Sequence, residues 1–506
     1  MTDAPVLAFD DLTYTRSQLD ALSAGLARIL ADRGVGRGHR VAVMSSNRPE
    51  FVFAVQAIWR LGASAVLISP AWKPAEVSAA VALSGATHAV GDSPVLADLM
   101  PMLHLDEPIA PAEPRVGASD PDADAVLVFS SGTTGLPKAV RHTHRSFAAG
   151  VRHWRDALQL TAADRMQIVT PPSHILGLLN IATVLQAGAW MRLHRRFDID
   201  VMLRHIARDR ITIEMAVAPI ALAIASHPHL EGHDLSSLRY IMWCATPVTE
   251  SVAEEVTRRT GVGWVSAYGT SEVPVIACCP LDQPRLDTVG RPVPGVEVRI
   301  VDIETGRPVV AGVPGEIQVR SESAMAGYLP DSENPFTGGW YRTGDIGHLD
   351  EDGFLRITDR LKEMVKVRGF QVAPAEIEAV LHGHPAVRDC AVFGVADDRL
   401  GQRVVAAVVL RPGAAAPGLD ELRTHVEATL PRTAAPRARP VGGGHDPAGH
   451  LRPRAGGGLP GRHRGGLQRV DAAVAPSAGR AERTAGRPRQ VPRRPDAALR
   501  PGASVA

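Results

Sequence analysis

Cysteine is scarce in this chain, and long apolar runs are missing from it. Four cysteines occur among 506 residues, namely Cys244, Cys278, Cys279 and Cys390. Their number and spacing exclude a disulfide framework and a structural zinc site. No window holds 18 uncharged apolar residues, which excludes an ordinary transmembrane helix. The segment Met1–Pro5 has neither the basic nor the apolar stretch of a secretory signal. We therefore expect a cytoplasmic protein without a membrane span.

Lysine is scarce as well, and charge is unevenly spread. The lysines are Lys73, Lys138, Lys362 and Lys366. The net charge is +1, but residues 437–506 hold fourteen arginines against four acidic residues, a net of +10, so residues 1–436 carry −9. The remaining composition, with 45% hydrophobic and 22% charged residues, is that of a globular protein. The length allows two or more domains.

Alternating helical and strand patterns predict an α/β fold with a mostly parallel sheet. Helical spacing predicts a helix over Ser17–Arg33 with Ser17 as its N-cap. Strands are predicted at Arg40–Met44 and Ser64–Ser69, with an apolar helix between them, and a second α/β stretch covers residues 125–275. The glycines between the first helix and strand are interpreted as a helix stop, because a dinucleotide fingerprint would follow a strand; they are Gly34, Gly36 and Gly38.

The pattern changes after residue 290. Short β segments broken by Gly, Pro and Asp predict a small β-rich subdomain over residues 291–341, followed by a hairpin. A compact α+β pattern follows Asp359 and ends near Pro436. We therefore predict three parts: a large domain over 1–359, made of two α/β subdomains and the β-rich subdomain; a small mobile α+β domain over 360–436; and a tail over 437–506.

The richest stretch in chemistry is Ala125–His144, "AVLVFSSGTTGLPKAVRHTH". A buried strand leads into small and hydroxylated residues and then a lysine. Backbone N–H groups, hydroxyls and an ammonium at such a turn can surround phosphate oxygens. The spacing differs from that of a Walker A loop. The phosphate-binding candidates are Ser131, Gly132, Thr133, Thr134, Gly135 and Lys138.

This loop resembles the signature of the AMP-forming acyl-CoA synthetases, a superfamily shared with luciferases and peptide-synthetase adenylation domains. Further motifs of the family follow in order: "PPSHILGL" with His174, "AYGTSE" over Ala267–Glu272, "WYRTGDIGHLDEDGF" with Asp345, and "DRLKEMVKVRGFQVAPAEIE" over Asp359–Glu378. The resemblance covers about residues 10–436. It implies that a carboxylate attacks the α-phosphorus of ATP to give acyl-AMP and pyrophosphate, after which the thiol of coenzyme A displaces AMP.

The resemblance also implies roles for single residues. Glu272 would hold Mg²⁺, Tyr268 would stack on adenine, Asp345 would accept the ribose hydroxyls and Arg360 would reach ribose and phosphate. The remaining nucleotide-binding candidates are Ala245, Thr246, Gly269 and Thr270. Lysine and hydroxyl groups suit this reaction because it brings negative charges together, so positioning and charge neutralisation must supply the catalysis.

The acceptor and acyl sites are implied in the same way. His174 resembles the gate between the acyl pocket and the thiol tunnel, with a satisfied core histidine as the alternative. Lys362 marks a hinge about which the small domain would rotate. Arg368, Gly369 and Phe370 would bind coenzyme A, and Lys366 and Gln371 match residues of the thioester step. Trp243 and Cys244 replace a common Ser-Gly pair; a tryptophan there would restrict the pocket to a short, branched, cyclic or aromatic acid, unless it turns into the core. His142 and His144 are interpreted as structural rather than as a metal pair.

The resemblance fails after "LPRTAAP" (Leu430–Pro436), because relatives continue into a loop whose lysine bridges carboxylate and α-phosphate, and no lysine follows Lys366. One explanation is a disordered basic tail, for which nucleic-acid binding is the weaker possibility. The favoured explanation is a shift of reading frame in a GC-rich gene. When His445–Pro453 is back-translated and advanced by one base, the codons allow Ile-Pro-Arg-x-Thr-Ser-Gly, which resembles the missing loop.

Three functions stay open at this point: an acyl-CoA ligase with an impaired first half-reaction, an acyl-AMP ligase that loads a carrier protein, and a catalytically weak adenylate-binding protein. The oligomeric state is not predicted.

Overall fold

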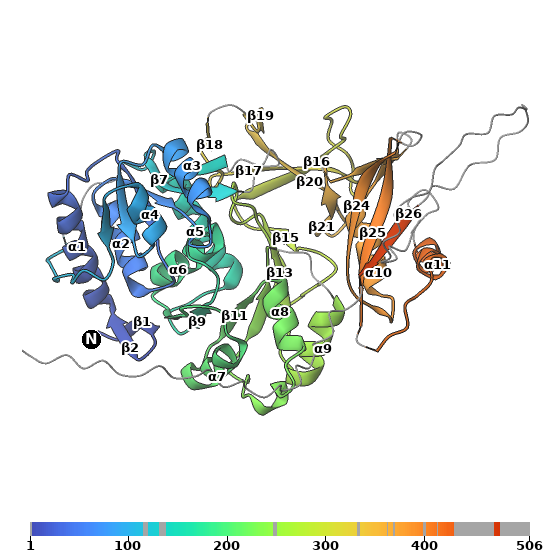
Figure 1. Cartoon of the computed structure of the whole chain (residues 1–506), viewed down its shortest axis with the longest axis horizontal. Coiled ribbons are helices and arrows are strands. Elements are labelled where there is room, and N and C mark those ends of the chain that lie inside the picture. The colour runs from blue at the N-terminus through green and yellow to red at the C-terminus, as the bar shows by residue number, and fades with distance from the viewer. Residues whose placement is uncertain are drawn as a thin grey trace, which may run out of the picture. The chain divides into compact units, whose positions relative to one another are not determined.

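The computed structural model describes residues 3–114, 120–130, 138–245, 250–330, 334–361, 363–367, 370–397, 401–411, 413–429 and 470–475. The chain divides into two compact units. Unit 1 comprises Met1–Met364 and Ala373–Ala379, and unit 2 comprises Val365–Val372 and the chain from Val380 onward. The mixed α/β architecture agrees with the predicted fold class (Figure 1).

Two large sheets form the frame of unit 1. In the described residues the first sheet has the order β15 (Arg291–Pro292), β14 (Ala277–Cys278), β13 (Trp264–Tyr268), β12 (Tyr240–Trp243), β11 (Ile213–Ala216), β9 (Arg165–Ile168), β10 (Trp190–Leu193), β1 (Pro5–Phe9) and β2 (Leu12–Thr15). The second has the order β18 (Gly327–Leu329), β8 (Lys138–Thr143), β7 (Asp124–Ser130), β4 (Ser64–Leu67), β3 (Arg40–Met44), β5 (His88–Gly91) and β6 (Met102–His104). Their central strands are parallel, as predicted.

Helices cover both faces of each sheet. One apolar cluster joins a face of both sheets to four helices, α1 (Arg16–Asp32), α2 (Pro49–Arg60), α5 (His144–Leu158) and α6 (Ile175–Ala187). The opposite face of the first sheet packs on α7 (Ile199–Asp209), α8 (Ala218–Ala225) and α9 (Glu250–Thr260), near the short helix Leu230–Gly232. The opposite face of the second sheet packs on α3 (Pro74–Ser84) and α4 (Pro94–Leu99).

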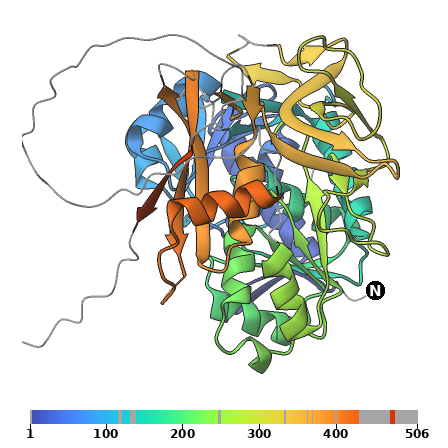
Figure 2. The ribbon, with the colours of Figure 1, turned by 90° about the vertical axis from the view of Figure 1, so that its right-hand side faces the viewer.

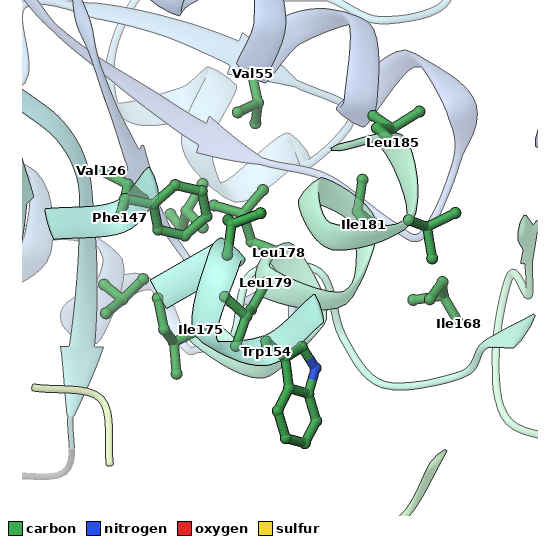
Figure 3. Close-up of a cluster of buried hydrophobic side chains, with 14 of the residues drawn as sticks. Val55, Val126, Phe147, Trp154, Ile168, Ile175, Leu178, Leu179, Ile181 and Leu185 are labelled. Atoms are coloured by element: carbon green, nitrogen blue, oxygen red, sulfur yellow. The ribbon is translucent and has the colours of Figure 1, made fainter. Parts of the chain in front are cut away.

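Helix α6, which begins directly after His174, packs against α5. Figure 3 shows Ile175, Leu178 and Leu179 of α6 beside Phe147 of α5. The helices are also joined by a hydrogen bond from Trp154 Nε1 to Asn180 Oδ1 of 2.7 Å. Burial of several large side chains at about 1.5–3 kcal/mol each makes this contact a rigid part of the core.

The β-rich subdomain is an antiparallel sheet, as its broken pattern indicated. Its strands are β16 (Val296–Val301), β17 (Gly315–Ser321), β20 (Trp340–Leu349) and β19 (Phe336–Thr337), with β21 (Leu355–Arg360) paired to β20. The turn between β20 and β21 passes through Gly353, whose φ of +79° favours glycine. This hairpin places Asp345 directly opposite Arg360.

Unit 2 has the predicted α+β composition. Its strands are β22 (Val365–Val367), β23 (Phe370–Val372), β24 (Val387–Asp397) and β25 (Gly401–Leu410), followed by α11 (Leu419–Thr429); α10 (Pro374–His382) begins in unit 1 and ends in unit 2. Figure 2 shows the two long strands β24 and β25 in orange. A further strand, β26 (Val470–Ala475), pairs in parallel with β25.

Two expectations need correction. The N-cap of α1 is Thr15 rather than Ser17, because Thr15 and Gln18 form a reciprocal capping box: Gln18 N–H donates to Thr15 Oγ1 at 3.2 Å and Thr15 N–H donates to Gln18 Oε1 at 2.9 Å. The tail over 437–506 contains β26, although no ordered element was expected there. An edge strand with unpaired backbone groups can accept such a segment.

Candidate functional site

The loop after β13 carries two of the predicted residues. Tyr268 ends the strand, and Glu272 lies four residues later. The loop closes through hydrogen bonds from Ile276 N–H to Tyr268 O and from Thr270 N–H to Val273 O, at 2.8 and 2.9 Å. Gly269 makes the closure possible, since a Cβ there would lie 2.1 Å from the carbonyl oxygen of Pro274. The sequence thus holds Tyr268 and Glu272 at the carboxyl end of a buried strand.

Asp345 meets Tyr268 and Arg360. The Tyr268 hydroxyl donates a short hydrogen bond to Asp345 Oδ2, and Arg360 Nε donates to Asp345 Oδ1 at 3.0 Å. Asp345 is buried, whereas the Arg360 side chain is 63% exposed. Burial raises the pKa of Asp345 above its ordinary value, and the bonds from Tyr268 and Arg360 act in the opposite direction. Burial and the nearby Asp345 charge raise the pKa of Tyr268, so its hydroxyl keeps the proton that it donates.

A second group joins Glu272 to the phosphate-loop lysine. The Tyr328 hydroxyl donates to Glu272 Oε1 at 2.8 Å, and Lys138 Nζ lies 5.4 Å from the centroid of the Tyr328 ring. Glu272 is buried. Tyr341 is close to Glu272 and Tyr328, because burial raises the pKa of Tyr341 and these two residues raise it further. One tyrosine therefore contacts both a carboxylate and an ammonium.

The buried ring of His142 contacts the loop that follows β13. It is fully buried, and its Nε2 bonds to the carbonyl oxygen of Ser271 at 2.7 Å while Nδ1 contacts Ser146 Oγ at 3.3 Å. Burial lowers the pKa of His142 to about 4, against the bond to Ser271. The ring is therefore neutral at pH 7 and, because a carbonyl only accepts, carries its proton on Nε2. These contacts agree with the structural interpretation of His142, and the ring of His144 packs edge-on against Trp59.

His174 stands at the start of α6 as its N-cap. Its Nδ1 accepts a hydrogen bond from Leu176 N–H at 3.3 Å, and the residue is exposed, so His174 is not the satisfied core histidine of the alternative interpretation. Gly177 permits the tight entry into this helix, because a Cβ there would lie 2.2 Å from the carbonyl oxygen of Pro171. An exposed imidazole at the start of a helix can serve as a gate, and the role predicted for His174 stays a prediction.

The acyl-pocket assignment of Trp243 and Cys244 needs revision. Trp243 is 1% exposed and packs against Trp264, with ring centroids 5.2 Å apart, in the cluster beneath α7, α8 and α9. Cys244 belongs to the cluster on the opposite face of the sheet, and burial raises the pKa of its thiol to about 12. Successive residues of a strand alternate between faces, so these two side chains cannot line one pocket. Trp243 therefore turns into the core, which was the alternative interpretation of the sequence.

The other predicted residues are placed as follows. Ala245 has a left-handed φ of +64°, Thr270 Oγ1 accepts from Val273 N–H at 3.0 Å, and Lys366 N–H donates to Gln402 Oε1 at 2.7 Å. Strand β23 contains Phe370 and Gln371. The predicted residues that lie outside the described part are Ser131, Gly132, Thr133, Thr134, Gly135, Thr246, Lys362, Arg368 and Gly369.

Sequence reasoning missed Tyr328 and the support that His142 gives to Ser271. Residue 328 is separated from Glu272 by 56 positions, and nothing in the surrounding "AGYLP" indicates a contact with an acidic residue. The hydrogen bond arises only because β18 pairs with β8.

The donor set suits Mg²⁺ as a partner of a bound nucleotide. Glu272 offers a hard oxygen, and Oε2 has no hydrogen-bond partner among the described residues. The described part of the chain contains no group of three or more His, Cys, Asp or Glu that could hold a metal alone. This arrangement fits an ion bound by one carboxylate together with phosphates and water. No helix in the described ranges is both long and apolar enough to cross a bilayer.

Two family models match the chain. The AMP-binding enzyme model matches residues 1–329, and the model of the AMP-binding enzyme C-terminal domain matches residues 376–441. Curated relatives include 4-coumarate–CoA ligase 2 of Oryza sativa subsp. japonica, 34% identical over 81% of each chain, and 4-coumarate–CoA ligase 1 of Solanum tuberosum, 35% identical over 80% of this chain and 81% of the relative.

Solved structures give the same result. The amide bond synthetase McbA from Marinactinospora thermotolerans is 29% identical over 92% of both chains, with a TM-score of 0.79. The o-succinylbenzoate CoA synthetase MenE from Bacillus subtilis, in complex with its acyl-adenylate intermediate, is 30% identical over 84% of this chain and 89% of that chain, with a TM-score of 0.76. The chain therefore belongs to the family of AMP-binding, AMP-forming synthetases, as the ordered motifs predicted.

Proposed function

We propose that this protein activates a compact carboxylic acid with ATP and transfers the acyl group to the thiol of coenzyme A. The observation that carries the proposal is the contact of Asp345 with Tyr268 and Arg360. A buried carboxylate held by a neutral hydroxyl and an exposed cation is suited to accept two ribose hydroxyls beside an aromatic ring that can stack on adenine. Support also comes from relatives that are named as CoA ligases.

In the first half-reaction the acid attacks the α-phosphorus and pyrophosphate leaves. Thr133, Thr134 and Lys138 would hold the phosphates, and Glu272 would hold Mg²⁺. When bound, Mg²⁺ would neutralise charge that develops between the phosphates. The residues of the chain hold and orient the nucleotide, which is the main catalytic contribution available in phosphoryl and adenylyl transfer.

The nature of the acid is proposed from the relatives. Several are named 4-coumarate–CoA ligases, and MenE acts on an aromatic dicarboxylic acid by its name. We therefore favour an aromatic acid within the compact class predicted from the sequence. Trp243 no longer supports this preference, since it lies in the core.

The first half-reaction should be slower than the second. No lysine follows Lys366, so the cation that bridges carboxylate and α-phosphate in relatives has no counterpart in the sequence. Losing one positioned donor typically costs on the order of 10²–10³ in rate. The transfer of a supplied acyl-AMP to the thiol does not need that cation.

The test compares the two half-reactions in the full chain. ATP–pyrophosphate exchange is measured with a panel of aromatic, cyclic and aliphatic acids, and consumption of the synthetic acyl-AMP is measured with coenzyme A. We expect slow exchange with an aromatic acid and faster thiol-dependent consumption. Exchange at the rate typical of intact family members would contradict the expected impairment. Failure to consume any acyl-AMP with coenzyme A would contradict the ligase function.

A second acceptor class is favoured by one comparison. The amide bond synthetase McbA aligns with 92% of this chain, so an amine is a reasonable alternative to the thiol. Parallel reactions of the acyl-AMP with coenzyme A, a phosphopantetheinylated carrier protein and a panel of primary amines separate these functions. The amine alternative requires amide formation that exceeds the uncatalysed rate while thioester formation does not.

A further inference from the structure

The backbone around Tyr328 is bonded to both elements that carry the charged residues Glu272 and Lys138. Strand β18 is antiparallel to β8, with Tyr328 opposite Val140. Just before this strand, Met325 N–H donates to Glu272 O and Ala326 N–H donates to Arg141 O, both at 2.8 Å. The short segment 325–329 therefore joins the loop that carries Glu272 to the strand that begins with Lys138. These backbone bonds fix the Cα of Tyr328 relative to both charged residues.

The side chain of Tyr328 acts on both charges in different ways. Its hydroxyl bonds to Glu272 Oε1 at 2.8 Å, and this bond selects the orientation of a buried carboxylate. The ring lies 5.4 Å from the ammonium of Lys138, within the range of a cation–π contact.

We propose that Tyr328 is a positioning residue for the binding of Mg²⁺ with ATP. Its hydroxyl holds Oε1 of Glu272 and leaves Oε2 as the oxygen that the ion would take, while its ring contacts Lys138, which follows the phosphate-binding candidates in the sequence. This inference rests on the proposed function, because it assumes that Glu272 and Lys138 bind the nucleotide. Hydrogen bonds to a ligating carboxylate typically change metal affinity by about 10–100-fold when they are removed.

The test is Tyr328→Phe in the full chain, since it removes the hydroxyl and keeps the ring. ATP binding is measured by titration calorimetry over a series of Mg²⁺ concentrations. We expect the half-saturating Mg²⁺ concentration to rise by about tenfold or more, with no change in ATP binding measured in EDTA. Tyr328→Leu should also weaken binding in EDTA, because it removes the ring beside Lys138.

A matched control is Tyr240→Phe. Tyr240 is also buried, and its hydroxyl donates to the carbonyl oxygen of Leu158 at 2.6 Å, at the opposite end of the strands that lead to the site. This variant should lose thermal stability without a change in the Mg²⁺ dependence. Because the control also removes a buried hydroxyl bond, it separates positioning of the ion from a general loss of stability.

A double-mutant cycle of Tyr328→Phe and Glu272→Gln tests whether Tyr328 acts through Glu272. If Tyr328 acts through Glu272, Tyr328→Phe has no further effect on the Mg²⁺ dependence in the Glu272→Gln background. If Glu272→Gln raises the Mg²⁺ requirement and Tyr328→Phe does not, the inference is wrong and the proposed function stands. If the wild-type chain binds ATP with no Mg²⁺ dependence, both are wrong.

Discussion

Replacing Asp345 with asparagine should separate ATP binding from folding. The side chain is buried, and burial raises its pKa above the ordinary value even though Tyr268 and Arg360 contact it. The folded environment therefore disfavours the charge on balance. Asparagine removes that charge but keeps the shape and one acceptor oxygen. We expect the free energy of unfolding to stay within about 1 kcal/mol of the wild-type value, or to rise.

The effect on ATP should be large. If Asp345 accepts both ribose hydroxyls, the two charge-assisted hydrogen bonds are weakened by about 1.5 kcal/mol each. The sum of about 3 kcal/mol corresponds to a factor of roughly 150 in Kd. Titration calorimetry with ATP gives the Kd, and urea denaturation of the same preparations gives the free energy of unfolding.

The pH dependence supplies a second check with a definite sign. Because the pKa of Asp345 is raised in the folded state, the unfolded state ionises first as pH increases from about 3.8. Wild-type stability is therefore lost, relative to Asp345→Asn, as pH rises through the folded-state pKa, and the difference is constant above it. A stability difference of the opposite sign would show that the charge of Asp345 stabilises the fold.

Asp350 in the same hairpin is the matched control. Burial opposes its ionisation, but the N–H of Phe354 and the charge of Arg285 hold its pKa below the ordinary value; the N–H donates at 2.8 Å and the ion pair measures 3.2 Å. Asp350→Asn should lower stability by about 1 kcal/mol and leave ATP binding unchanged. If Asp345→Asn unfolds the protein and leaves the Kd for ATP intact, our account of the site is refuted.

Three further predictions concern the frame of the site. Gly269→Ala places a Cβ against the Pro274 carbonyl and should lower the free energy of unfolding by about 1–3 kcal/mol and weaken ATP binding. At Gly263 a Cβ would meet nothing within 4 Å, so Gly263→Ala should change neither quantity. Urea denaturation measures the stability and titration calorimetry measures the binding. Trp243→Phe should lower stability by about 2 kcal/mol without changing the preference among acids, and an altered preference in the exchange assay would restore its role in the acyl pocket. The pKa of His142 is about 4 in the folded protein, below its ordinary value of 6.5, so the free energy of unfolding should fall as the pH drops from 6.5 to 4. His142→Gln should show a shallower fall in urea titrations, and an unchanged slope would contradict this assignment.

The sequence was sufficient wherever local pattern decides the structure. Arg40–Met44 is a strand with the predicted bounds, because apolar β-branched residues bounded by breakers leave few alternatives. The N-cap of α1 was misplaced because Thr15 and Gln18 satisfy each other's backbone donors. Ser17 has the right chemistry, but a reciprocal pair two residues earlier satisfies more of the unpaired N–H groups.

The contacts of the site needed the tertiary structure. Motif order predicted that Tyr268, Glu272, Asp345 and Arg360 act together, and the structure joins Asp345 to two of them. The sequence could not predict which face of β12 carries Trp243, because a fully buried parallel strand has apolar residues on both faces. Tyr328 was missed for a related reason, since pairing between β18 and β8 is a long-range event.

The position of the binding residues along the chain bears on the missing lysine. Tyr268, Glu272, Tyr328 and Asp345 all precede Met364, and their contacts lie within unit 1. ATP affinity should therefore depend little on the chain after residue 436. A bridging lysine, by contrast, would act mainly on the transition state, where carboxylate and α-phosphate approach each other. Its loss should lower kcat for adenylation and leave the Kd for ATP close to that of intact relatives. Restoring the reading frame across residues 437–466 should then raise the exchange rate by about 10²–10³ without tightening ATP binding. A parallel gain in affinity would mean instead that the tail disturbs the nucleotide site itself.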